Sequence, residues 1–247
     1  MKLFPSFLLV ILWSIASCSC QKKSNTGEES TPPPVVEPSV GKVNVLLTTA
    51  NRQKELYKEQ TDLKLIKNPN ASYSITLKPA EKFQTIYGFG AAITGSTCYN
   101  LMQMSPADRK AFLTETFSET EGFGQNFVRI SIGCSDFSLS EYTLCDTKGI
   151  EHFALTKEET QYVIPILKEI LAINPKVQII GSPWTPPRWM KVNNLTDLQP
   201  HNQWTSGQLN PAHYQDYALY FAKWLQAIKD NGLNVNAITI QNEPLNR

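Results

Sequence analysis

From residue 83 onward, strand-like and helical patterns alternate along the chain, and this alternation restricts the fold more than any other feature. Strand-like apolar runs cover residues 85–93, 127–132, 176–180 and 235–240. Helix starts are predicted at Ser105-Pro106, at the capping box Thr156-x-x-Glu159, and at Asn210-Pro211, with Asn231-Gly232 closing the last helix. Strands and helices that alternate in this way predict βα units around a parallel sheet.

Two α/β architectures fit this order, a doubly wound open sheet and a (β/α)8 TIM barrel. A doubly wound dinucleotide-binding sheet needs a glycine fingerprint after its first strand. Gly88-Phe89-Gly90 offers the first part of one, but position 93 is isoleucine and the acidic Asp108 lies inside a predicted helix start. We therefore expect these glycines to let a strand end pass close to a neighbour, and the barrel is favoured.

The charge balance and the cysteine count exclude several classes of function. There are 23 Lys and Arg against 22 Asp and Glu, with no basic cluster, so no nucleic-acid partner is expected. The three histidines lack metal-ligand spacing, and neither a metal nor a cofactor is predicted. Three cysteines, Cys98, Cys134 and Cys145, lie in the region predicted to fold, and this odd number argues against a framework of disulfides. A bridge between Cys134 and Cys145 stays open, but buried free thiols are favoured.

The chain begins with the pattern of an export signal. Met1-Lys2 is followed by an apolar stretch to Ala16, and Ile15-Ala16-Ser17-Cys18 resembles a bacterial lipobox. Residues 1–20 are thus predicted to be a signal peptide, with Cys18 lipidated, and residues 21–41 a Pro-rich tether. The prediction is an exported lipoprotein, periplasmic or on the cell surface. Ordinary cleavage, with Cys18 incidental, is the alternative.

A short segment between the tether and the alternating region has a β pattern. Residues 43–49 and 73–77 alternate roughly between apolar and polar side chains. Residues 42–82 are therefore predicted to contribute strands to a small β module.

Polar and aromatic side chains follow the predicted strands where a barrel carries its functional residues. Asp136 follows the second strand, Trp184 the third, and Asn242-Glu243 the fourth. Indole faces stack on sugar C–H faces, and carboxylate and amide groups bind sugar hydroxyls. Trp184 could equally pack beneath its Pro-rich loop, and Asp136 could be a turn residue. A strand that ends in Asn-Glu-Pro has little structural reason for its glutamate.

Four ordered motifs carry a resemblance to a known family. GFGAAITGS, VRISIGCSDFS, SPWTPPRWMK and AITIQNEP resemble glycoside hydrolase family 30, which includes glucosylceramidases and endo-β-1,6-glucanases. The resemblance spans residues 83–247. It implies a (β/α)8 barrel beside a β-sandwich, and hydrolysis of β-glucosidic bonds with retention by two glutamates.

The resemblance also implies roles for individual residues. Glu243 would be the general acid/base and Asn242 the partner of the 2-hydroxyl group. Asp136 and Trp184 would line the site of the glycone, and Arg129 would support the carboxylates. The implied partner is a β-glucan or β-glucoside substrate, with membrane contact only through the lipid anchor.

The chain departs from the family pattern in its length. Four strands precede Arg247, whereas a barrel has eight, and the family's nucleophile lies on a later strand. Residues 83–247 are therefore expected to form the first half of a barrel that shows no turnover alone. The alternative is a non-catalytic glycan-binding lipoprotein on a degenerate barrel. Glu243 argues against it, because a binding module needs no proton donor beside Asn242.

Overall fold

The computed structural model describes residues 41–59, 63–65 and 72–245. The chain divides into two compact units, residues 1–82 and residues 83–247. The predicted signal peptide, the lipidation of Cys18 and nearly all of the tether lie outside the described residues. Within the described ranges, no helix is long and apolar enough to cross a membrane.

The first unit contains two small antiparallel sheets. β1 (Gly41–Val43) pairs with β4 (Leu63–Leu65), and β2 (Leu46–Leu47) pairs with β3 (Tyr57–Lys58). The predicted strand at residues 43–49 is thus present in part. The predicted strand at residues 73–77 is wrong: the segment is irregular, and Tyr73 and Ile75 are 94% and 90% exposed. Alternation alone does not make a strand, because a strand also needs a neighbour to pair with.

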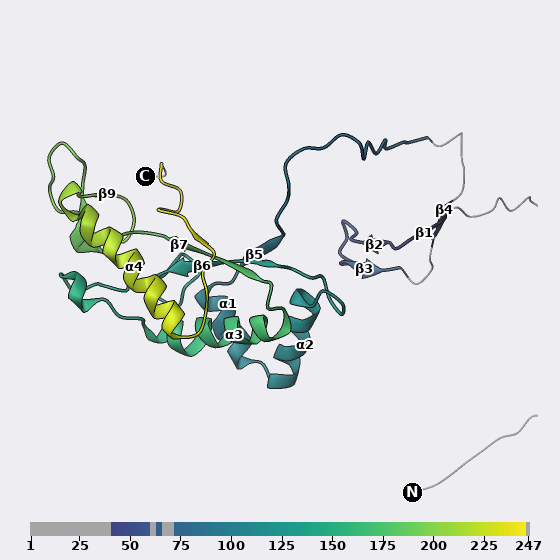
Figure 1. The fold of residues 1–247 in the computed structure, drawn as a ribbon, viewed down its shortest axis with the longest axis horizontal. Helices are drawn as coiled ribbons and strands as arrows, with labels where there is room; N and C mark the ends of the chain where they lie inside the picture. The colour runs from purple at the N-terminus through teal and green to yellow at the C-terminus, as the bar shows by residue number, and fades with distance from the viewer. Residues whose placement is uncertain (1–40, 60–62, 66–71, 246–247) are drawn as a thin grey trace, which may run out of the picture. The chain divides into compact units, whose positions relative to one another are not determined.

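The second unit is built on a parallel sheet (Figure 1). Its strands are β5 (Gly90–Ala92), β6 (Phe127–Ile132), β7 (Gln178–Pro183) and β10 (Ala237–Ile238), and all adjacent pairs are parallel. The order β10-β7-β6-β5 follows the chain without reversal. A doubly wound sheet reverses its strand order at a switch point, whereas a barrel does not. The topology is that of successive βα units of a barrel.

Helices connect the strands of this sheet. They are α1 (Gly95–Gln103), α2 (Pro106–Phe117), α3 (Ile164–Ile173) and α4 (Tyr214–Asp230). Figure 1 shows α1, α2 and α3 on the same side of the sheet. The predicted strand at residues 85–93 is present only as β5, since residues 85–89 are irregular, and α1 was not predicted. The Thr94 side chain caps α1 by accepting a hydrogen bond from the backbone N–H of Thr97 (3.3 Å).

The predicted helix starts are confirmed by their capping bonds. Ser105 Oγ accepts from the backbone N–H of Asp108 at 3.2 Å. Glu159 Oε2 accepts from the backbone N–H of Thr156 at 2.8 Å, which is the reciprocal bond of a capping box. A π-helical turn, Glu159–Val163, then leads into α3. Asn210 Oδ1 accepts from the N–H of Ala212 at 3.0 Å and opens the 3₁₀ turn Pro211–His213 before α4.

The core lies between the sheet and the helices. Alternate residues of β6 are buried against the helices, and α4 contributes Tyr217, Tyr220, Trp224 and Ile228 at helical spacing. Gly181 of β7 makes this packing feasible, because a Cβ there would collide with the indole of Trp224. Gly90 is likewise required where β5 approaches β6, since its Cβ would collide with the carbonyl oxygen of Phe127. The close-approach explanation of this glycine is confirmed.

Two further features concern the loops. A small antiparallel pair, β8 (Lys191–Val192) with β9 (Gln208–Leu209), follows β7 and was not predicted. Cys98, Cys134 and Cys145 are buried and free, which confirms the favoured prediction and removes the Cys134–Cys145 bridge.

Candidate active site

One face of the sheet, opposite the helices, carries a chain of polar side chains. Arg129 of β6 pairs in register with Ile180 of β7, so Arg129 and Ser182 project from the same face. Arg129 Nη2 donates to Ser182 Oγ at 2.8 Å, and Ser182 Oγ lies 2.6 Å from Thr239 Oγ1. This row of hydrogen bonds links β6 and β7 to the residue directly after β10, close to the strand ends where the candidate catalytic residues lie.

The same guanidinium group holds the candidate site residues that follow β7 and β10. Arg129 Nη2 donates to Asn242 Oδ1 at 2.7 Å, and the guanidinium carbon lies 5.4 Å from the centre of the Trp184 ring. Because the amide oxygen of Asn242 accepts from Arg129, the amide would meet a sugar hydroxyl with its NH2 group. Arg129, Trp184 and Asn242 are thus brought together.

The Gln-Asn-Glu-Pro segment is tied to β7 beyond the end of β10. The backbone N–H of Asn242 donates to Pro183 O at 2.9 Å, and Gln241 Nε2 donates to Trp184 O at 2.6 Å. Glu243 is exposed and has a φ of 44°, in the left-handed region that non-glycine residues seldom adopt. Strained backbone of this kind is concentrated at functional sites.

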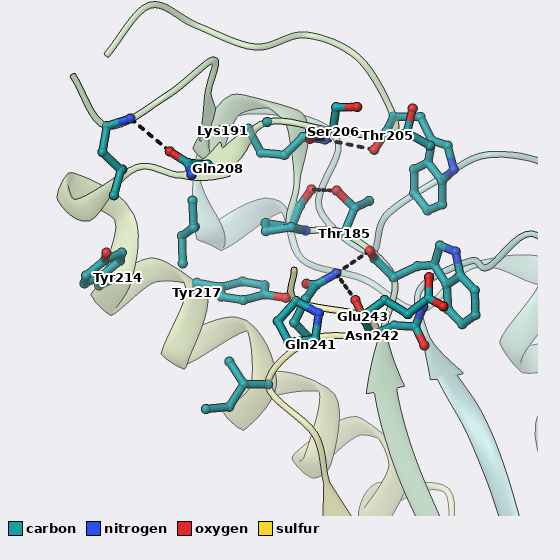
Figure 2. Close-up of a pocket in the computed structure, with 18 residues that line it drawn as sticks. Thr185, Lys191, Thr205, Ser206, Gln208, Tyr214, Tyr217, Gln241, Asn242 and Glu243 are labelled. Atoms are coloured by element: carbon teal, nitrogen blue, oxygen red, sulfur yellow. Dashed lines mark hydrogen bonds between the residues drawn. The ribbon is translucent and has the colours of Figure 1, made fainter. Parts of the chain in front are cut away.

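A pocket of about 660 Å³ lies against this segment (Figure 2). Figure 2 shows Gln241, Asn242 and Glu243 along one wall, Lys191, Thr205 and Ser206 along another, and Tyr214 and Tyr217 on a third. Trp184 and Trp204 also line it. Of the described residues that line the pocket, only Glu243 bears a carboxylate.

Lys191 is the buried cation of this pocket, and its side chain secures a loop. Its Nζ donates to the carbonyl oxygens of Trp204 at 2.8 Å and of Ser206 at 3.1 Å. Burial, helped by the nearby Arg188, lowers the pKa of the Lys191 ammonium to about 8. Lys191, Trp204 and Tyr217 were not predicted as site residues. Lys191 and Trp204 do not directly follow a predicted strand end, and Tyr217 fits the apolar helical spacing of α4.

Asp136 is placed differently from the other candidates. It follows β6 at the same end of the sheet, but it is exposed and does not line the pocket. No group of three or more His, Cys, Asp or Glu in residues 41–59, 63–65 and 72–245 could hold a metal ion.

A singly wound parallel βα sheet with polar side chains at the carboxyl ends of its strands defines the TIM-barrel class. The family model for the glycosyl hydrolase family 30 TIM-barrel domain matches residues 86–246. The chain belongs to glycosyl hydrolase family 30, and the expected family and barrel fold are confirmed.

Known proteins similar to this chain include both glucosylceramidases and glucanases. The lysosomal acid glucosylceramidase of Mus musculus is 35% identical over 69% of the chain and 33% of its own length. An endo-1,6-beta-D-glucanase of Neurospora crassa is 34% identical over 72% of the chain and 37% of its own length. A solved endo-beta1,6-glucanase is 62% identical, with a TM-score of 0.71, over 81% of the chain and 42% of that structure. The chain therefore spans less than half the length of these proteins.

Proposed function

We propose that the protein is a retaining glycosidase that cleaves β-1,6-linked glucans, with Glu243 as its general acid/base. The observation that carries the proposal is the position of Glu243: it lines the pocket beside Asn242, which Arg129 Nη2 holds at 2.7 Å. The family and the barrel fold support the reaction class. Glucosylceramide-like substrates are the second candidate, since relatives of both kinds match the chain.

The proposed reaction proceeds in two displacements. The protonated carboxyl group of Glu243 gives its proton to the glycosidic oxygen while a second carboxylate, about 5–5.5 Å away, attacks the anomeric carbon. The leaving group departs as an alcohol, and a covalent glycosyl-enzyme forms. Glu243 then takes a proton from water, which attacks the same carbon and releases the sugar.

The second carboxylate is proposed to lie outside these 247 residues. Glu243 bears the only carboxylate among the described pocket residues, and the chain spans 33–42% of the relatives compared above. The separation of the two carboxylates is set by closure of the barrel. The 247 residues alone are accordingly expected to show no turnover.

The choice of β-1,6-glucan as substrate depends on similarity. The 62% identity to a solved endo-beta1,6-glucanase is well above the 35% identity to the glucosylceramidase. Asp136 is proposed to bind the glycone with Trp184, although it does not line the pocket. Export as a Cys18-anchored lipoprotein is proposed on the lipobox alone, and mass spectrometry of the mature amino terminus tests it.

The test of Glu243 compares leaving groups in the natural full-length protein. Glu243→Gln is expected to slow hydrolysis of β-1,6-linked oligosaccharides by about 10²–10⁴-fold while leaving their binding largely intact. Aryl glycosides need less protonation of the leaving oxygen, so the loss for them should be smaller. Glu115→Gln, an exposed change on α2, is the matched control. Equal losses for both substrate types would contradict the acid/base role.

A further inference from the structure

The pocket extends well beyond Glu243 and Trp184. It continues toward β9 and the start of α4, lined by Trp204, Leu209 and Tyr214, whereas Asp136 does not line it. An acid/base residue must lie between the two halves of the substrate, because its proton goes to the oxygen that joins them. If the proposed function holds, with the glycone beside Trp184 and Asp136, the remaining part of the pocket lies on the leaving-group side.

The β8–β9 loop on that side, residues 193–207, is held in place by Lys191 of β8 and by His201 of the loop itself. Lys191 Nζ donates to the carbonyl oxygens of Trp204 (2.8 Å) and Ser206 (3.1 Å). His201 Nε2 lies 2.8 Å from Thr205 O, so three successive carbonyl groups are engaged. Trp204 is half-buried on this loop. A fixed aromatic surface binds a ring at low entropic cost, because the ordering of the loop has already occurred on folding.

Tyr217 supplies an unmatched polar group on the same side. The residue is 4% exposed, and its Oη has no hydrogen-bond partner within the part of the chain that the structure describes. Tyr217 lines the pocket, and Figure 2 shows its hydroxyl directed toward Gln241. Burial raises the pKa of the Tyr217 hydroxyl, so the group stays protonated and can donate. An unmatched buried hydroxyl is costly unless a ligand satisfies it.

The composition of the lining indicates an uncharged, hydroxyl-rich ligand. Among the described residues that line the pocket, only Lys191 and Glu243 are charged, and Lys191 is engaged with two carbonyl oxygens. The remaining groups are aromatic, amide and hydroxyl side chains, and the volume lies within the usual range for small-molecule sites.

We propose that Trp204 and Tyr217 form a sugar subsite for the leaving group, in which the indole stacks on a pyranose ring and the phenol bonds to one of its hydroxyls. The inference rests on the proposed function and specifies it further. Lys191 is a positioning residue here, since it acts by holding the loop that carries Trp204.

The test uses two substrates in the natural full-length protein. Gentiotriose, a chain of three β-1,6-linked glucoses, fills the leaving-group side, whereas β-glucosyl fluoride has no leaving sugar. Trp204→Ala should lower kcat/KM for gentiotriose roughly tenfold, whereas kcat/KM for glucosyl fluoride should stay within about twofold of the wild-type value. Tyr217→Phe should lower the gentiotriose value by roughly three- to tenfold without loss of thermal stability, which a purely structural hydroxyl would not permit. Phe123→Ala, an exposed aromatic outside the pocket, is the control.

Lys191→Met should lower kcat/KM for gentiotriose, as Trp204→Ala does, and should leave kcat/KM for glucosyl fluoride nearly unchanged. Unchanged or equal effects on both substrates in the Trp204 and Tyr217 variants would overturn the subsite, provided that hydrolysis still depends on Glu243. Absence of hydrolysis of either substrate by the natural protein would instead overturn the proposed function, and the subsite with it.

Discussion

Arg129 and Asn242, 113 positions apart in the sequence, are joined by a 2.7 Å hydrogen bond from Nη2 to Oδ1. The same nitrogen donates to Ser182 Oγ, so one guanidinium group fixes two acceptors on two neighbouring strand ends. Arginine suits this position because its donors are held in a rigid plane that also stacks on Trp184.

Replacing this arginine is expected to affect both stability and the site. Arg129→Met removes the donor to Asn242 Oδ1 and one of the two partners of Ser182 Oγ, and should lower the free energy of unfolding by about 1–3 kcal/mol. Arg129→Lys should recover part of the stability but not the stacking on Trp184. Urea denaturation measures both, with Lys110→Met, an exposed change on α2, as a control expected within about 0.5 kcal/mol of wild type.

Lys191 should make stability depend on pH in the alkaline range. Its pKa is lowered from 10.5 to about 8 on folding, so the unfolded chain binds more protons between these values. Stability is therefore expected to rise with pH from about 8 to 10.5, and the cost of the buried charge is fully present below pH 8. Relative to that of Lys191→Met, the free energy of unfolding of the wild type should rise by on the order of 2 kcal/mol between pH 8 and 10.5.

The comparison with Lys191→Met cancels the titration of other groups. Urea denaturation of both proteins at pH 7, 8, 9 and 10 supplies the two profiles. Parallel profiles would show that the ammonium group is not desolvated as its position indicates.

Gly90 should tolerate no side chain. A Cβ at this position meets the carbonyl oxygen of Phe127 in the β5–β6 pair, and neither backbone can yield without breaking the pairing. Gly90→Ala is expected to cost about 3 kcal/mol or more. Gly232→Ala is the matched control: its φ of 82° is strained for alanine, but nothing lies within 4 Å, so about 1–2 kcal/mol is expected. Thermal denaturation that ranks the two variants in the opposite order would contradict this.

The three buried thiols should be unreactive in the folded protein. Burial raises the pKa of Cys98 and Cys134 to about 12, and that of Cys145 in the same direction. At pH 8 a thiol with a pKa near 12 is ionised in roughly one molecule in ten thousand. Iodoacetamide should therefore modify these residues only after the protein unfolds. No reducing agent should be needed, because the three thiols are free. Labelling of any of them under native conditions, read by peptide mass spectrometry, would count against their burial.

The features predicted correctly from the sequence are those that local patterns determine. The strand at residues 127–132 has a clear period of two, and its buried and half-buried residues alternate accordingly. The capping hydrogen bonds of Ser105, Thr156 and Asn210 join residues two or three positions apart, so the local sequence is enough to predict them. Trp184 and Asn242 were expected at one rim because parallel strand ends lie at one edge of a sheet, whereas Arg129 was named only through the family resemblance.

The features that were missed depend on contacts between distant parts of the chain. β8 and β9 have two residues each, too few for a period, and are held by pairing across a fifteen-residue loop. Lys191 looks like an ordinary surface lysine in the sequence; its role follows from the carbonyl groups that fold over it. Tyr217 fits the apolar stripe of α4, and nothing in that stripe distinguishes the hydroxyl that lines the pocket.

In the proposed role of Glu243 as general acid/base, its left-handed backbone makes activity and stability compete at this position. At a φ of 44°, the backbone of glutamate is higher in conformational free energy than that of glycine or asparagine, by about 1 kcal/mol or more. Directed evolution that selects for heat resistance alone is expected to favour Glu243→Gly or Glu243→Asn, and would remove the proposed proton donor. Libraries screened for thermostability should therefore keep position 243 fixed, and natural paralogues freed from catalysis would be expected to lose their glutamate here first.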